Sequence, residues 1–292
     1  MAPAEASIFS EDAEALAHEA WPGEQYVLRL HAPETAARAR PGQFVHLTCD
    51  PLLPMRRPLS IQRTGPEEGW VELLYKVVGE GTRLLARRTI GERLSLLGPI
   101  GRPFPMDPEV RYPVLLGGGV GIPPMVFLAE SLRGRRDVEP AAFLGSEVPF
   151  PFATVPAGLP LPGLPAEAGR AHALLEEWGV PSRLASAAGL PGAYRGYVTG
   201  LAAAYLEPLA PAERRRAAIY AVGPEPMLEA AARLGRELGV AVWVSLEEYM
   251  ACGVGGCAGC TVRVEEPTGP AMRRVCVDGP VFPGERVFLS TD

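Results

Sequence analysis

The chain has 292 residues, of which 47% are hydrophobic, and its formal net charge is −6. An acidic protein lacks the basic surface that binds nucleic acid or an anionic membrane, so we expect neither partner. The N-terminus, MAPAEASIFSEDAEALAHEA, is acidic where a signal peptide is basic, and no apolar run approaches about 18 residues. We therefore expect a cytoplasmic protein of two or three domains.

The N-terminal third consists of short apolar runs separated by turn signals. The runs begin at Glu24 and end near Leu97, and residues 43–48 and 71–77 alternate with the two-residue period of a strand. This spacing is typical of an antiparallel barrel or sandwich. We expect the barrel domain to cover residues 1–108.

Two short patterns in this third suit a flavin dinucleotide. In Arg56-Arg57-Pro58-Leu59-Ser60, a guanidinium can take a phosphate with two hydrogen bonds, and the serine and the local backbone can face the ring nitrogens. Gly79-Glu80-Gly81-Thr82 opens an expected helix over 82–88, whose N-terminus is a candidate site for the pyrophosphate. A solvated arginine pair and a plain turn with a helix cap are the alternative interpretations.

The middle third alternates expected strands and helices, which predicts a parallel sheet over residues 109–244. A strand over 112–116 precedes GGGVGIPPM and a helix to about Leu132, the order found in nucleotide-binding α/β units. Further strands are expected at 141–145, 182–185, 218–222 and 240–244, and further helices at 170–178, 199–206 and up to Leu238. The proline-rich stretch 149–165 is expected to be a surface loop.

Two features after these strands point to a dinucleotide. Gly223-Pro224 follows the strand at 218–222, at the carboxyl edge where open α/β sheets bind their ligands. Glu147 follows the strand at 141–145; its carboxylate can bind a ribose hydroxyl and would repel a 2′-phosphate, which favours NAD over NADP. The alternative for Glu147 is a solvated loop acid.

The last third contains four of the five cysteines, in the spacing C-x4-C-x2-C followed by one distant cysteine. Four thiolates so spaced are typical of a plant-type [2Fe–2S] cluster, and the glycines among them let the backbone wrap closely around it. Structural zinc, which also takes four thiolates, is the alternative. The four are Cys252, Cys257, Cys260 and Cys276, in an expected domain over residues 245–292.

Outside these patterns the sequence predicts little chemistry. Cys49 is expected to be a small core residue. No spacing suggests a Ser-His-Asp or paired-carboxylate arrangement, and none of the four histidines is assigned a role. We therefore expect no catalytic acid or base on this chain.

Together the motifs resemble a known family. Arg-Pro-x-Ser, the glycine-opened α/β unit and G-P-E-P-M resemble the ferredoxin–NADP reductase superfamily of flavoproteins. With S-L-E-E-Y-M-x-C-G-x-G-x-C-x-x-C and C-V-D-G-P-V-F added, nearly the whole chain resembles the electron transfer subunits of dihydroorotate dehydrogenase B. The resemblance implies three domains that bind FAD, NAD and a [2Fe–2S] cluster.

The resemblance also implies which residues contact each group. For FAD they are Arg57, Pro58, Leu59, Ser60, Leu74, Tyr75, Lys76, Gly81 and Thr82. For NAD they are Gly117, Gly118, Gly119, Gly121, Gly223 and Pro224. The cluster ligands would be Cys252, Cys257, Cys260 and Cys276.

The partner implied by the resemblance is an FMN-containing catalytic subunit that oxidises dihydroorotate in pyrimidine biosynthesis, within a heterotetramer. Electrons would pass through the cluster and FAD to NAD⁺, because a cluster carries one electron, a nicotinamide accepts a hydride, and a flavin can do both. Two alternatives stay open. One is the same architecture in another complex, such as a sulfhydrogenase or a bifurcating transhydrogenase; the other is a binding module with a structural metal and no hydride transfer.

Overall fold

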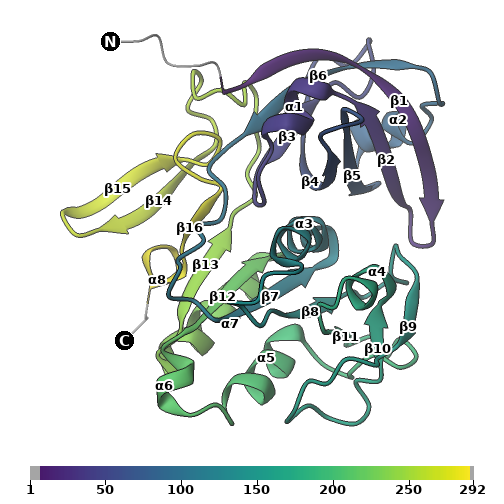
Figure 1. Ribbon diagram of the computed structural model, residues 1–292. Coiled ribbons are helices and arrows are strands. Elements are labelled where there is room, and N and C mark those ends of the chain that lie inside the picture. The colour runs from purple at the N-terminus through teal and green to yellow at the C-terminus, as the bar shows by residue number, and fades with distance from the viewer. Residues whose placement is uncertain (1–6, 290–292) are drawn as a thin grey trace.

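The computed structural model describes residues 7–289 (Figure 1). Residues 1–6 and 290–292, which belong to the first and last expected domains, lie outside the described residues. Among the helices of residues 7–289, none combines the length and the apolar character that a membrane crossing requires.

The N-terminal part is a closed antiparallel barrel with the strand order β1-β2-β5-β4-β3-β6, which confirms the barrel expectation. Two short helices, α1 (Pro33–Arg38) and α2 (Glu80–Leu85), connect its strands. The strands are β1 (Phe9–Trp21), β2 (Gln25–His31), β3 (Phe44–Leu47), β4 (Arg57–Gly65), β5 (Trp70–Lys76) and β6 (Arg93–Ile100).

Three details of the barrel differ from the expectation. Strand β1 begins at Phe9, well before Glu24, because its inward positions Ala13 and Ala15 are too small to produce an apolar run in the sequence. Helix α2 covers 80–85 and not 82–88. All four residues of β3 are buried, so its alternation does not mark an exposed face: one face lines the barrel core and the other lies under the C-terminal region.

The middle part is an α/β unit, and its parallel sheet is confirmed. The sheet has the order β11-β8-β7-β12-β13-β16, in which the first five strands are parallel. These five are β7 (Tyr112–Gly118), β8 (Ala141–Gly145), β11 (Ser182–Ala185), β12 (Ala217–Val222) and β13 (Ala241–Ser245). The helices are α3 (Ile122–Leu132), α4 (Ala173–Glu177), α5 (Val198–Leu206), α6 (Pro211–Arg214) and α7 (Glu225–Leu238).

The expected helix over 170–178 is wrong in its first turn. Residues Arg170–His172 form strand β10, which pairs antiparallel with β9 (Thr154–Pro156), so the expected surface loop over 149–165 also contains a strand. Helix α4 begins only after His172, whose ring nitrogen Nδ1 accepts a hydrogen bond from the backbone N–H of Leu174. A side chain that caps a helix in this way has extended backbone, which explains the strand before it.

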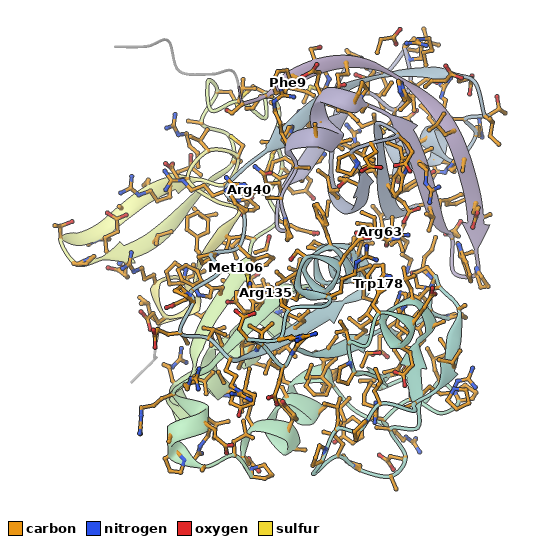
Figure 2. All side chains as sticks on the ribbon, in the orientation of Figure 1. Phe9, Arg40, Arg63, Met106, Arg135 and Trp178 are labelled. Atoms are coloured by element: carbon orange, nitrogen blue, oxygen red, sulfur yellow. The ribbon has the colours of Figure 1, made fainter. Side chains whose placement is uncertain are left out.

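Helix α3 lies between the barrel and the sheet (Figure 1). It packs on one face of the sheet, whereas α5 and α7 pack on the other. Its Phe127 belongs to the barrel core, and its Glu130 forms an ion pair with Arg63 of β4 at 3.0 Å. Arg63 also lies over the ring of Trp178, near which Figure 2 shows it. The barrel and the α/β unit are therefore joined by both packing and charge.

The C-terminal part begins with the cysteine loop and continues as a projecting hairpin, β14 (Thr261–Glu266) and β15 (Gly269–Arg274) (Figure 1). The chain then returns as β16 (Val281–Pro283), which pairs antiparallel with β13 and completes the sheet, and ends in α8 (Gly284–Val287). The domain boundary at residue 245 stays a prediction, but the segment that follows it shares the sheet of the α/β unit.

Candidate functional site

The residues expected to bind FAD lie at the start of β4, at the end of β5 and in the first turn of α2. Two of them are in close contact: a Cβ atom added to Gly81 would lie 2.7 Å from Nε of Arg57. The guanidinium therefore lies directly over the glycine backbone, and its Nη1 donates a hydrogen bond to the carbonyl oxygen of Met55 at 2.8 Å. An arginine fixed beside an open backbone is suited to hold a phosphate group with two hydrogen bonds.

The first turn of α2 contributes less to anion binding than its sequence predicted. The helix has six residues, and the dipoles of so few peptide groups sum to little. The hydroxyl of Thr82 is also engaged locally, since its Oγ1 accepts hydrogen bonds from the backbone N–H groups of Val78 and Gly79 at 3.0 and 3.3 Å. The candidate phosphate site therefore depends on Arg57 and the backbone at Gly81.

The side chain of Tyr75 points into the barrel. It is 1% exposed, and its hydroxyl lies 2.8 Å from Nε2 of His18. The other ring nitrogen of His18 lies 2.9 Å from the carbonyl oxygen of Arg88, which can only accept, so Nδ1 donates this hydrogen bond. Burial raises the pKa of Tyr75. Only the backbone near Tyr75 can therefore face a ligand.

The remaining expected FAD residues divide by exposure. Leu59 and Leu74 are buried, with Leu59 in the barrel core, whereas Pro58, Ser60 and Lys76 are half-buried. No sequence pattern pointed to His18, because a histidine on a strand of alanines and acids looks like a solvated residue. His18 meets Tyr75 only because β1 pairs with β2, which in turn pairs with the strand β5 that carries Tyr75.

The glycines expected to bind NAD form two loops at one edge of the sheet. Gly117 and Gly118 end β7, and Gly223 follows β12; these strands are parallel neighbours, so their carboxyl ends meet. The loops are in contact: a Cβ on Gly121 would lie 2.1 Å from the carbonyl oxygen of Val222, and one on Gly223 would lie 3.2 Å from Cα of Gly118. Only glycine permits this approach, which leaves backbone rather than side chains at the edge.

The other expected NAD residues lie at the same loops. Gly119 and Gly121 lie in a short 3₁₀ turn that leads into α3, and Gly119 has a φ of +56°. Pro224 immediately precedes α7. Glu147 follows β8, and its carboxylate accepts a hydrogen bond from the backbone N–H of Ala187 at 3.2 Å. An acid is therefore present beside the carboxyl ends of the strands.

The four cysteines fall into two pairs. The sulfur atoms of Cys260 and Cys276 are buried and lie 3.4 Å apart. Cys252 is half-buried and Cys257 is exposed, and the backbone N–H of Cys257 points at the sulfur of Cys252 at 3.5 Å. Within residues 7–289 no three ligating side chains converge on one metal position. A [2Fe–2S] cluster does not need such a position, because each of its two irons is bound by one pair of thiolates.

The surroundings of the cysteines suit an iron–sulfur cluster. The backbone N–H of Gly259 points at the sulfur of Cys257 at 3.4 Å, and such hydrogen bonds stabilise bound thiolates. Gly255 has a φ of +83°, and a Cβ there would lie 2.5 Å from Cγ2 of Val277. A compact loop of glycines and thiols with inward N–H groups therefore fits a [2Fe–2S] cluster.

Two of the thiols, one from each pair, differ in acidity. Backbone hydrogen bonds, first that from Cys257, lower the pKa of Cys252 to about 6. Burial, followed by the neighbouring thiol of Cys260, raises the pKa of Cys276. Since iron binds thiolates, Cys252 is ionised near neutral pH before any metal arrives, whereas Cys276 must lose its proton on binding.

Comparison with known proteins supports the assignment of this region. Residues 247–288 match the family model described as the iron–sulfur cluster binding domain of dihydroorotate dehydrogenase B. The chain is 35% identical to the dihydroorotate dehydrogenase B (NAD(+)) electron transfer subunit of Shouchella clausii, over 91% of this chain and 93% of that protein. It is 34% identical to the subunit of the same name from Geobacillus thermodenitrificans, over 90% and 93%.

Solved structures share the fold. One, described as an NADH-dependent reduced ferredoxin–NADP oxidoreductase in flavin-based electron bifurcation, has a TM-score of 0.76 and 28% identity, over 95% of this chain and 90% of that chain. Phthalate dioxygenase reductase has the fold at 16% identity, with a TM-score of 0.56 over 94% and 78%. The barrel, the glycine loops, the paired cysteines and these relatives agree: the chain belongs to the family of dihydroorotate dehydrogenase B electron transfer subunits.

Proposed function

We propose that this chain carries electrons from an FMN-containing dihydroorotate dehydrogenase subunit, through a [2Fe–2S] cluster and FAD, to NAD⁺. One observation carries the proposal. Cys260 and Cys276 pack in the same apolar cluster as Phe44 of β3 and Ile100 of β6. Strand β3 pairs with β4, which begins with Arg57, so a cluster held by these cysteines would lie against the barrel that contains the candidate FAD residues.

Each group of residues then has a distinct task. Arg57, the backbone at Gly81 and the half-buried Ser60 would bind FAD, which supplies the conversion between one-electron and two-electron transfer. The glycine loops at Gly121 and Gly223 would admit a dinucleotide close to the backbone. The four cysteines would bind the cluster, and the exposed Cys257 would leave its outer edge open to a partner.

We further propose NAD over NADP, on the basis of Glu147. A carboxylate beside the strand ends accepts a hydrogen bond from a ribose hydroxyl and repels a 2′-phosphate. The test compares the rate of FAD reduction by NADH and by NADPH in the wild type and in Glu147→Gln. The wild type should prefer NADH and the variant should lose part of that preference. A wild type that prefers NADPH would contradict the proposal.

The partner subunit is proposed to be bound in a heterotetramer of two copies of each chain. Cys257 is exposed and Tyr249 is 95% exposed, so the outer surface of the cysteine loop is free for docking. Light scattering on the co-purified complex gives its mass and hence its stoichiometry. A mass equal to one copy of each chain would exclude the heterotetramer without excluding the electron path.

The function itself is tested by spectroscopy on anaerobically purified protein, with and without the FMN subunit. Dihydroorotate should bleach the FAD and cluster absorbance only when the partner is present, and NAD⁺ should restore it. Flavin and iron that respond to NADH but never to dihydroorotate would assign the chain to another complex, the alternative that the bifurcating oxidoreductase structure favours. Colourless protein that contains zinc would leave only a metal-binding module.

A further inference from the structure

His46 lies at the junction between the barrel and the cysteine loop. It is in β3, where Val45 and Leu47 point into the barrel core. Phe44 lies two residues earlier, on the opposite face of the strand, and packs with Met250 and Ile100. Because side chains alternate along a strand, His46 shares the face of Phe44 and points at the cysteine loop.

The ring of His46 is buried, and the backbone groups that reach it, at Met250 and Arg56, lie outside good hydrogen-bond geometry. Its exposure is 0%, and neither Nδ1 nor Nε2 has a partner of good geometry among the described residues. Burying an unpaired polar group costs about 1–3 kcal/mol, and native proteins seldom retain one without a reason. A leucine or phenylalanine would fill this apolar junction without that cost.

The atoms around His46 belong to two functional segments. On one side is the cysteine loop: a Cβ on Gly253 would lie 2.8 Å from Nδ1, so the backbone next to Cys252 is pressed against the ring. On the other side His46 pairs in register with Pro58 of β4, between Arg57 and Ser60 of the candidate FAD site. The ring is therefore wedged between the strand that would hold FAD and the loop that would hold the cluster.

The surroundings of the ring favour its neutral form. Burial, and then the charge of Arg56, lower the pKa of His46, while the backbone of Met250 and of Arg56 lies close enough to oppose this effect. A neutral imidazole has one N–H donor and one acceptor nitrogen. The backbone within its reach belongs to the start of the cysteine loop and to the approach to β4, so its single N–H can tie one of these segments to the barrel.

We propose that His46 is a positioning residue: its ring and its single N–H fix the cysteine loop, and therefore the cluster, at a set place relative to the FAD-binding strand. In this role it acts through the backbone of the loop and not as a ligand of a substrate or cofactor. The inference rests on the proposed function only in that the four cysteines bind a [2Fe–2S] cluster. Iron and sulfide analysis of the wild type tests that assumption separately, because wild type without iron defeats the proposed function itself.

The test compares His46→Phe with His46→Gln in the holoprotein. Phenylalanine keeps most of the ring volume and removes the N–H, whereas glutamine restores a donor. We measure iron release to a chelator and the electron paramagnetic resonance spectrum of the dithionite-reduced cluster. His46→Phe should release iron about tenfold faster, the effect typical of residues that orient metal ligands, with shifted g-values. His46→Gln should remain close to the wild type.

Two controls separate positioning from general packing. Phe44→Leu loses apolar volume in the same junction without removing a polar atom, and it should change iron release and the spectrum less than His46→Phe does. If Phe44→Leu matches His46→Phe, or if His46→Phe matches the wild type, the proposal is wrong. The same contact can be tested by substitutions in the cysteine loop, which are needed if His46→Phe does not fold.

Gly253→Ala and Gly256→Ala form this second pair. The methyl group of Gly253→Ala would press on Nδ1 of His46 from 2.8 Å, at a φ of +69°, whereas nothing lies within 4 Å of a Cβ on Gly256. Gly253→Ala should therefore reproduce the shifted spectrum and faster iron release, and Gly256→Ala should not. Equal behaviour of the two variants would overturn the inference.

Discussion

The buried ring of His172 makes the stability of the α/β unit depend on pH. It is 6% exposed and stacks on Phe152 with ring centroids 4.0 Å apart. Its Nδ1 accepts the hydrogen bond that caps α4, which a protonated ring cannot do. Burial, and then the charge of Arg63, lower the pKa of His172 from 6.5 to about 3, while its own backbone acts in the opposite direction.

The size of the effect follows from this difference in pKa. Between pH 6.5 and about pH 3 the unfolded chain binds a proton that the folded chain excludes, so the stabilisation is complete above 6.5 and is lost as the pH falls. At pH 5 the unfolded ring is almost fully protonated and the folded ring is not, which removes about 2 kcal/mol relative to pH 7.

The assay measures urea unfolding of the wild type and of His172→Asn near pH 7 and near pH 5. Asparagine keeps an acceptor for the cap of α4 and removes the titrating ring. Fluorescence and circular dichroism should give coincident transitions, which justifies one free energy of unfolding. The wild type should lose about 2 kcal/mol more than the variant between the two pH values. Equal losses would refute the claim that His172 is buried as a neutral acceptor.

Three further predictions concern the candidate cofactor sites. Arg57→Lys should bind FAD about tenfold more weakly, because an ammonium group cannot donate the two parallel hydrogen bonds of a guanidinium to one phosphate. Titration of the apoprotein with FAD measures the dissociation constant. In Gly121→Ala the added methyl group would lie 2.1 Å from the carbonyl oxygen of Val222. This variant should lose about 1–3 kcal/mol of stability and most of its rate of FAD reduction by NADH, while it retains its iron. Rates close to the wild type would contradict the close approach of the loops. Cys257→Ser should lose iron but retain FAD, which iron and flavin analysis on the same sample can check.

Sequence patterns predicted the elements whose signal is local. The strand, glycine loop and helix at 112–132 and the cysteine spacing appear where they were expected, because each depends on residues close together in the chain. The elements that were missed depend on distant partners. Strand β1 is recognisable only beside β2 and β6, and β10 only beside β9 and the cap at His172.

For the candidate site, the sequence likewise predicted residues that belong to local motifs but not the contacts between distant residues. The sequence identified Arg57, Gly81 and Thr82, but not that Arg57 lies over Gly81 or that the Thr82 hydroxyl is used inside its own turn. The histidines carried no sequence signal, because a lone histidine has no motif. The roles inferred here for His46 and His172 come entirely from burial and from what each ring contacts.

Strand β16 has a consequence for how the chain can be divided. It pairs with β13 and follows the cysteines in sequence, so the stretch that contains the thiols also closes the sheet of the nucleotide-binding part. Removal of everything after residue 245 would leave the backbone of β13 as an unpaired edge, which invites aggregation. The cysteine region is therefore not an independent module. If it is grafted onto another protein or replaced, the edge strand β16 must be included.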